Sequence, residues 1–201
     1  MFEGWKHQKI FDHFQKICEI PHGSYHEEAL SEYVYQFALS RGYTALKDQC
    51  HNVLVRIPAS EGREQEPSCL LQGHLDMVCE QVSDISHDFL KDPIVIHSEG
   101  DWLMADGTTL GGDDGIAIAY MLTLMEEAPR ISHPPLELLM TSAEEVGMDG
   151  AKALDPLWIQ SRRMINLDSE KEGEFIVGGA GGMRIEVRHS LQRTNVPEGY
   201  L

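Results

Sequence analysis

The 201-residue sequence lacks any closely spaced pair of cysteines. Its four cysteines, Cys18, Cys50, Cys69 and Cys79, form no C-x-x-C motif, which excludes a zinc ribbon and a thioredoxin-type redox site. Cys18 and Cys69 lie in apolar patterns and are expected to be thiols of the core. Because the first residues also contain no apolar signal segment, the sequence predicts a reduced, cytoplasmic protein.

Long apolar runs and basic residues are scarce as well. No run approaches the roughly 20 apolar residues that a membrane-spanning helix needs, so a membrane is not an expected partner. Lys and Arg number 16 against 33 Asp and Glu, which gives a net charge of −17. So acidic a protein repels phosphate backbones and attracts cations, which argues against nucleic acid as a partner. Most of these acids are expected to lie on the solvated surface.

Four helices are predicted from apolar residues at helical spacing, over residues 7–18, 24–42, 116–127 and 148–155. In the second helix Ser24 and Glu27 have the spacing of a capping box, so they are expected to bond to the first backbone N–H groups. The third helix is apolar nearly all round, which predicts that it is buried.

Strands alternate with these helices. They are predicted over residues 52–59, 69–74, 135–143 and 162–168, with two more strand-like runs around the glycine cluster of residues 174–191 and a short strand possible at 94–97. The runs "CLLQ" and "LELLM" are continuously apolar, which is typical of strands covered on both faces. The pattern predicts an α/β fold, a three-layer sandwich with a largely parallel mixed sheet.

One histidine and several single acids follow the ends of the predicted strands or precede the buried helix: His74, Asp76, Asp113, Glu144, Glu145 and Asp168. Ligands of open α/β sheets bind beyond the carboxyl ends of the strands, so these side chains are expected to converge. Alone, each has an ordinary interpretation, such as a loop histidine, a helix cap or a solvated acid. Together, imidazole and carboxylates without a thiolate indicate a hydrolytic metal site.

The residue types suggest a role for each member of the set. The His74 ring can bind a metal through one nitrogen while Asp76 accepts the other ring N–H. Asp113 has two carboxylate oxygens and lies in a glycine-rich turn, so it can bridge two ions. Two ions roughly 3.5–4 Å apart polarise a carbonyl and acidify water, which predicts metal-assisted hydrolysis of an amide.

The other three acids complete this arrangement. Glu145 and Asp168 can each bind one ion. Glu144 is adjacent to Glu145 and can accept a proton from the activated water.

The sequence resembles the aminoacyl-histidine dipeptidases (Xaa-His dipeptidase, peptidase D) within the di-zinc exopeptidases. The resemblance rests on segments in the family's order, "ICEIPHGSYHEE", "HNVLVR", "GHLDMV", "HDFLKDPI", "GTTLGGDDGIAIA", "EEVGMDGA", "INLDSE" and "GGAGG". It implies a di-zinc exopeptidase-like catalytic domain that hydrolyses dipeptides, with histidine preferred at their C-terminal position on the strength of the resemblance alone.

The resemblance also implies the ligands. His74 and Asp168 would bind one Zn²⁺, Asp113 would bridge, and Glu145 would bind the second Zn²⁺, with Co²⁺ or Mn²⁺ as possible substitutes. The catalytic pair would be Glu144, as general base, and Asp76, which supports His74.

In the family the peptide bond after the bridging aspartate is cis, which predicts a cis bond between Asp113 and Asp114. For Asp114 itself we expect only an acid at a helix N-terminus, favoured by the helix dipole, and no ligand role.

Members of the family are about twice as long as this chain. The resemblance therefore implies a catalytic metallopeptidase segment over residues 1–182 and the start of a truncated lid or dimerisation domain over residues 183–201, with the fold incomplete at the C-terminus. His189 is expected to be an ordinary residue at a strand end, so the family's last metal-binding histidine has no counterpart here. Full-length relatives are expected to be homodimers.

Two alternatives stay open from the sequence. One is a non-catalytic metal-binding fragment, which lacks the last ligand and the lid. The other is an aminoacylase or a carboxypeptidase of the same superfamily.

Overall fold

The structure is a computed structural model that describes residues 2–169, 171, 173–179 and 186–190. It divides into two units, Met1–Ser169 and Glu170–Leu201. The described residues of the second unit form neither helix nor strand. The two strand-like runs predicted within residues 174–191 are therefore wrong where the chain is described; Phe175 and Val177 there are almost fully exposed, without the packing that stabilises a strand. The predicted domain boundary after residue 182 lies outside the described residues.

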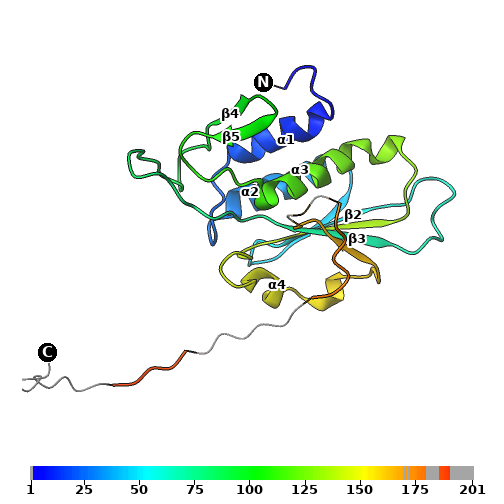
Figure 1. Ribbon diagram of the computed structural model, residues 1–201. Helices are drawn as coiled ribbons and strands as arrows, with labels where there is room; N and C mark the ends of the chain where they lie inside the picture. The colour runs from blue at the N-terminus through cyan, green and yellow to red at the C-terminus, as the bar shows by residue number, and fades with distance from the viewer. Residues whose placement is uncertain (1, 170, 172, 180–185, 191–201) are drawn as a thin grey trace, which may run out of the picture. The chain divides into compact units, whose positions relative to one another are not determined.

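A five-stranded mixed sheet forms the centre of the first unit (Figure 1). Its order is β1-β2-β6-β3-β7, with the bounds β1 Thr44–Lys47, β2 Val53–Ile57, β3 Cys69–His74, β6 Leu136–Thr141 and β7 Met164–Asn166. β3 pairs in parallel with β6 and β7, whereas β2 pairs antiparallel with β1 and β6. Four of the five strands therefore run in one direction, which confirms the predicted sheet. β1 was not predicted because its four residues are too few to show a pattern.

Helices cover both faces of this sheet (Figure 1). On one face α1 (Gln8–Cys18), α2 (Glu28–Ser40) and the largely buried α3 (Gly112–Glu127) form the main core, and α3 continues into the short 3-10 helix η1 (Ala128–Arg130). On the other face α4 (Asp149–Ala153) and η2 (Pro156–Trp158) are much shorter. There Leu54, Leu70 and Leu139 of the sheet pack against Leu154 and Trp158. The predicted three-layer sandwich is confirmed.

A two-stranded antiparallel hairpin, β4 (Ile96–Glu99) with β5 (Trp102–Ala105), lies beside α1 (Figure 1). The Ile94 N–H donates to the Cys18 carbonyl over 2.8 Å and so connects the approach to the hairpin with the end of α1. The predicted short strand at 94–97 thus begins two residues later, and β5 was not predicted.

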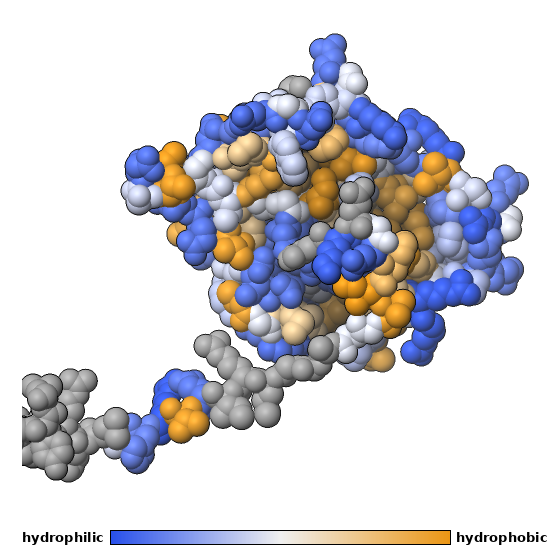
Figure 2. Space-filling view, in the orientation of Figure 1, coloured by the Kyte–Doolittle hydropathy of each residue, from blue (hydrophilic) through white to orange (hydrophobic). Residues whose placement is uncertain are grey.

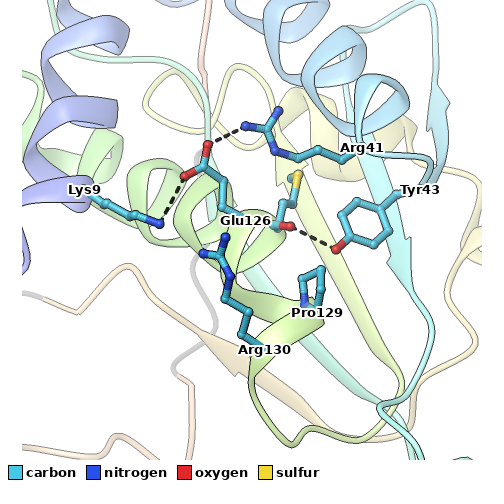
Figure 3. A pocket seen from close by; sticks show the side chains of 7 residues that line it. Lys9, Arg41, Tyr43, Glu126, Pro129 and Arg130 are labelled. Atoms are coloured by element: carbon cyan, nitrogen blue, oxygen red, sulfur yellow. Dashed lines mark hydrogen bonds and ion pairs between the residues drawn. The ribbon is translucent and has the colours of Figure 1, made fainter.

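The C-terminal end of α3 is attached to its two neighbouring helices through one glutamate (Figure 3). Glu126 accepts from Arg41, the residue that directly follows α2, and lies 3.8 Å from Lys9 Nζ of α1. Tyr43 donates its hydroxyl to the Met125 carbonyl over 2.9 Å. These groups border a hollow of about 360 Å³. The lysine and arginine side chains that line it pair with glutamates, so we interpret the hollow as the place where the helices meet.

The two thiols that were predicted to lie in the core differ in burial. Cys18 is buried, as predicted, and burial raises the pKa of its thiol to about 12, whereas Cys69 is only partly buried.

The surface in Figure 2 is mostly hydrophilic, with separate apolar patches. Within the described part of the chain, no helix has the length and apolar character needed to cross a membrane.

The buried carboxylate of Glu137 on β6 gives a prediction about acid stability. Its side chain is 5 % exposed and accepts from the backbone N–H groups of Ser161 (2.8 Å) and Gln160 (3.0 Å) and from Arg56 Nε (3.2 Å). Burial alone would raise the pKa of Glu137, but these donors outweigh it and lower the pKa. A lowered pKa means that the carboxylate stabilises the fold above its unfolded pKa of about 4.3 and loses this contribution as pH falls.

Glu137→Gln should therefore lower the free energy of unfolding by about 1–3 kcal/mol at pH 7 and by less near pH 3. Urea unfolding of both proteins at the two pH values, with EDTA present throughout, measures the difference. The exposed Glu99→Gln is the matched control and should change stability by under about 0.5 kcal/mol. An equal loss for Glu137→Gln at both pH values would contradict this account.

Candidate metal centre

The parallel pairing of the sheet brings the predicted site residues to one edge. His74 ends β3, and Asp76 follows it. Glu144 and Glu145 come shortly after β6, and Asp168 comes shortly after β7. Because β6 and β7 flank β3 in parallel, their carboxyl ends lie at the same edge as His74.

The His74 ring lies between two aspartates. It is buried, and its Nε2 lies 3.0 Å from Oδ1 of Asp113, at the N-terminal end of α3. Its Nδ1 lies 2.9 Å from the backbone oxygen of Asp76 and 3.4 Å from the Asp76 carboxylate. The carboxylate expected to receive this N–H is thus adjacent, but the backbone oxygen is the nearer acceptor. Either contact orients the ring so that Nε2 faces Asp113.

The ligand atoms form two overlapping sets. One contains His74, Asp113 and Glu145, and the other contains His74, Asp114 and Asp168. Within each set the nitrogen and oxygen atoms all lie within 4.8 Å of one another. All four residues predicted as ligands belong to at least one of these sets, and Asp114 is a further member of the second set.

Asp114 lies in the first turn of α3, as predicted, but the sequence did not reveal its contact with His74. Its carboxylate is buried and accepts the backbone N–H of His74 over 3.1 Å. Both Asp113 and Asp114 depart from helical φ/ψ values, and the bond between them is cis, as the resemblance implied. The approach requires Gly73, because a Cβ there would lie 2.5 Å from Asp114 Oδ2.

Crowded carboxylates shift the pKa values of the site. Burial alone would lower the pKa of His74, but Asp76, Asp114 and Asp168 outweigh it and raise the pKa to about 10. Burial and the neighbouring acids raise the pKa of Asp114 to about 7, although hydrogen bonding and the charge of His74 oppose the shift. The same two causes raise the pKa of Glu145 and of Asp168. Such mutual repulsion is what a bound cation relieves.

Asp76 behaves differently from these acids. Burial alone would raise its pKa, but hydrogen bonds and the charge of His74 lower it. Its Oδ1 accepts the Glu144 N–H over 2.9 Å, and its Oδ2 accepts the Glu145 N–H over 3.2 Å and the Ser24 hydroxyl over 2.8 Å. Asp76 is therefore an ionised anchor for the segment that carries the two glutamates.

The predicted capping box is wrong, and its residues support the site instead. No side chain caps α2, whose N-cap is Glu27. Ser24 donates to Asp76, while Glu27 is buried and accepts the N–H groups of Ala143 (2.8 Å) and Tyr25 (3.1 Å). Capping-box spacing shows that the side chains can reach nearby N–H groups, but tertiary contacts supplied other partners.

The donor set fits divalent metal ions. One imidazole nitrogen and several carboxylate oxygens from separate segments converge, and neither set includes a thiol. This chemistry suits zinc and the related ions that imidazole and carboxylate bind. Asp76 and Glu144 belong to neither set, which leaves their carboxylates available for other roles.

Comparison with known proteins agrees with the motifs. The chain is 46 % identical over 193 residues, 96 % of its length, to the cytosol non-specific dipeptidase of Escherichia coli. The crystal structure of aminoacylhistidine dipeptidase from Vibrio alginolyticus superposes with a TM-score of 0.82 over 86 % of the chain at 40 % identity. This chain is therefore similar in sequence and in structure to part of each of these dipeptidases. No family model matches it.

The homology covers part of each dipeptidase. The chain spans 40 % of the Escherichia coli protein and 35 % of the Vibrio alginolyticus chain. Aminopeptidase PepT from Bacillus cereus shares the fold at 21 % identity, with a TM-score of 0.68 over 83 % of this chain and 44 % of its own.

Proposed function

We propose that the protein hydrolyses dipeptides by a metal-dependent reaction in which water is activated between two Zn²⁺ ions. The observation that carries the proposal is the contact between His74 Nε2 and Asp113 Oδ1 within one ligand set, together with the membership of His74 in the second set. The identity of 46 % to a dipeptidase supports the reaction class. Since the chain spans under half of that relative, the activity is proposed for the complete protein.

We assign the ligands as the resemblance implied. His74 and Asp168, which share one set, would hold one ion, and Glu145 would hold the other. Asp113, which shares the second set with His74 and Glu145, would contribute to both ions through its two carboxylate oxygens. Asp114 supports this arrangement through the His74 backbone N–H. Bound divalent ions supply Lewis-acid polarisation of the peptide carbonyl and lower the pKa of a water molecule.

Of the two remaining acids, Glu144 would transfer protons and Asp76 would hold other residues of the site in position. Glu144 is partly exposed, and its backbone N–H is fixed by Asp76, so its carboxylate can take a proton from the attacking water and deliver it to the departing amine. Asp76 is buried and stays ionised, so it would hold His74 and the Glu144–Glu145 segment in place.

The substrate preference is a finer proposal. The Escherichia coli relative is named as non-specific, whereas the Vibrio alginolyticus relative is named for aminoacylhistidine substrates. Both names support dipeptides as the substrate class, and we propose Xaa-His dipeptides among them. Comparing kcat/KM for Ala-His, Ala-Leu and N-acetyl-Ala-His tests this: the N-acetylated peptide should be poor, and its preference would instead support an aminoacylase.

The setting of the reaction follows from the same relatives. The Escherichia coli relative is named as a cytosolic protein, and we propose the cytoplasm for this one. A homodimer of the complete protein remains part of the proposal.

The alternative of a metal-binding fragment without turnover predicts zinc binding by the isolated chain with no hydrolysis of any dipeptide.

Metal binding should stabilise the isolated chain, because a cation relieves the repulsion among the clustered carboxylates. At a free zinc concentration 100 times the dissociation constant, the gain is about 2.7 kcal/mol, which corresponds to a rise in Tm of several degrees. Thermal unfolding with zinc and with EDTA measures it.

Two variants make this test specific. Glu145→Ala should lose most of the zinc-dependent rise, while Glu99→Ala, an exposed acid on β4, should keep it. If saturating zinc leaves the Tm of the wild-type chain unchanged, no preformed metal site exists in it.

A further inference from the structure

A pocket of about 440 Å³ opens beside the candidate metal centre. Two residues connect it with that centre: Glu145, a member of a ligand set, and Ser24, which donates to Asp76. Its volume lies in the range of small-molecule sites. Because a ligand-set residue is part of its wall, a molecule bound at the metal centre can extend directly into the pocket.

The walls of this pocket carry apolar side chains that the fold leaves exposed. Val78, Leu90 and Val146 are 44 %, 57 % and 46 % exposed. Val78 and Leu90 come from distant parts of the loop between β3 and β4, and Val146 comes from the loop between β6 and α4. Phe89 lies beside them and is partly buried. Apolar side chains from separate segments that meet in a concave site are typical of ligand binding.

The charge of the pocket restricts what can enter. Glu80 and Glu145 line it, and no lysine or arginine is found among its described lining residues. A carboxylate on a substrate side chain would therefore meet two acids without a counter-ion. An apolar side chain would bury surface against Val78, Leu90 and Val146 without that penalty.

We propose that this pocket binds the apolar side chain of the first residue of the dipeptide, the residue whose carbonyl is attacked. The assignment rests on the proposed function. The Cα of this residue is one bond from the scissile carbonyl carbon, whereas the Cα of the second residue is two bonds away. A carbonyl held at the metal centre thus keeps the first side chain closer to that centre than the second, and Glu145 is shared by the centre and the pocket wall.

Amino acid hydroxamates test the pocket separately from the reaction, because the hydroxamate group binds the metal and the side chain remains variable. Isothermal titration of the zinc-loaded 201-residue chain should show leucine hydroxamate binding about 10-fold or more tighter than glycine hydroxamate. Aspartic acid hydroxamate should bind no tighter than the glycine compound.

Variants of exposed wall residues locate the effect. Leu90→Ser and Val146→Ser should each reduce the preference for leucine over glycine hydroxamate several-fold and leave glycine hydroxamate binding unchanged. Met148→Ser is the matched control, since Met148 is an exposed apolar residue near Val146 that does not line the pocket. It should keep the preference.

The failures can be told apart. Equal binding of leucine and glycine hydroxamates, or a preference that survives both wall variants, overturns the pocket and leaves the metal centre standing. Failure of every hydroxamate to bind the zinc-treated chain overturns the metal centre and the pocket together.

Discussion

Glu144→Gln should lower kcat of the active protein by about 10²–10⁴-fold, the usual contribution of a general base. The amide keeps the shape of the side chain but cannot accept the proton of the attacking water. The Glu144 backbone N–H remains bonded to Asp76, and Glu144 lies in neither ligand set, so metal binding should not change. Steady-state kinetics with a Xaa-His dipeptide and a zinc titration measure the two effects.

Glu99→Gln serves as the control for this substitution, because Glu99 is exposed and lies at the end of β4. It should retain wild-type kcat. Near-normal turnover by Glu144→Gln would remove Glu144 from the reaction, and a large loss of zinc affinity would make it a ligand instead.

Asp76→Asn should cost about 2–5 kcal/mol of stability and also weaken metal binding. The buried carboxylate accepts two backbone N–H groups and one hydroxyl, and it lies 3.4 Å from His74 Nδ1. An asparagine NH₂ group would face at least one of these donors, so a hydrogen bond becomes a repulsive contact. The loop that carries Glu144 and Glu145 then loses its anchor.

Ser24→Ala provides a graded comparison, since it removes a single donor to Asp76. Its expected cost is about 1 kcal/mol, with a smaller loss of zinc affinity than Asp76→Asn causes. Urea unfolding with EDTA and competitive zinc titration give both quantities for each variant. Wild-type stability of Asp76→Asn would show that Asp76 is not the anchor of this loop.

The positions of the site residues could be predicted from the sequence because parallel strands end at one edge of the sheet. His74 and Asp76 follow the apolar run of β3, and Glu144 follows that of β6. Strand ends can be recognised from local patterns, and the rule for ligand placement in α/β sheets needs no further geometry. The contact between His74 and Asp113 agrees with this interpretation.

The partners of the buried acids could not be predicted in the same way. Ser24 and Glu27 have capping-box spacing, yet their acceptors and donors are Asp76 and Ala143, which are distant in sequence. The inward turn of Asp114 depends on φ/ψ values that a local pattern does not reveal. The sequence did carry one signal of this close contact, the glycine directly before His74. A residue without Cβ allows close approach of a neighbouring group.

The short strands and the exposed apolar side chains of the pocket could not be predicted for a related reason. β1 and β5 have four residues each, too few to show alternation against a half-exposed background. Val78 and Leu90 belong to the long loop between β3 and β4, whose apolar residues show no periodicity, so their meeting beside Glu145 is a property of the tertiary fold.

Anomalous diffraction at the zinc edge, from crystals of the 201-residue chain grown with zinc, tests the metal centre most directly. The account predicts two peaks roughly 3.5–4 Å apart, with the Asp113 carboxylate in contact with both. His74 Nε2 should lie about 2.0–2.1 Å from one peak, and a Glu145 oxygen should contact the other. Zinc peaks elsewhere, with none within reach of His74 and Asp113, would contradict the account.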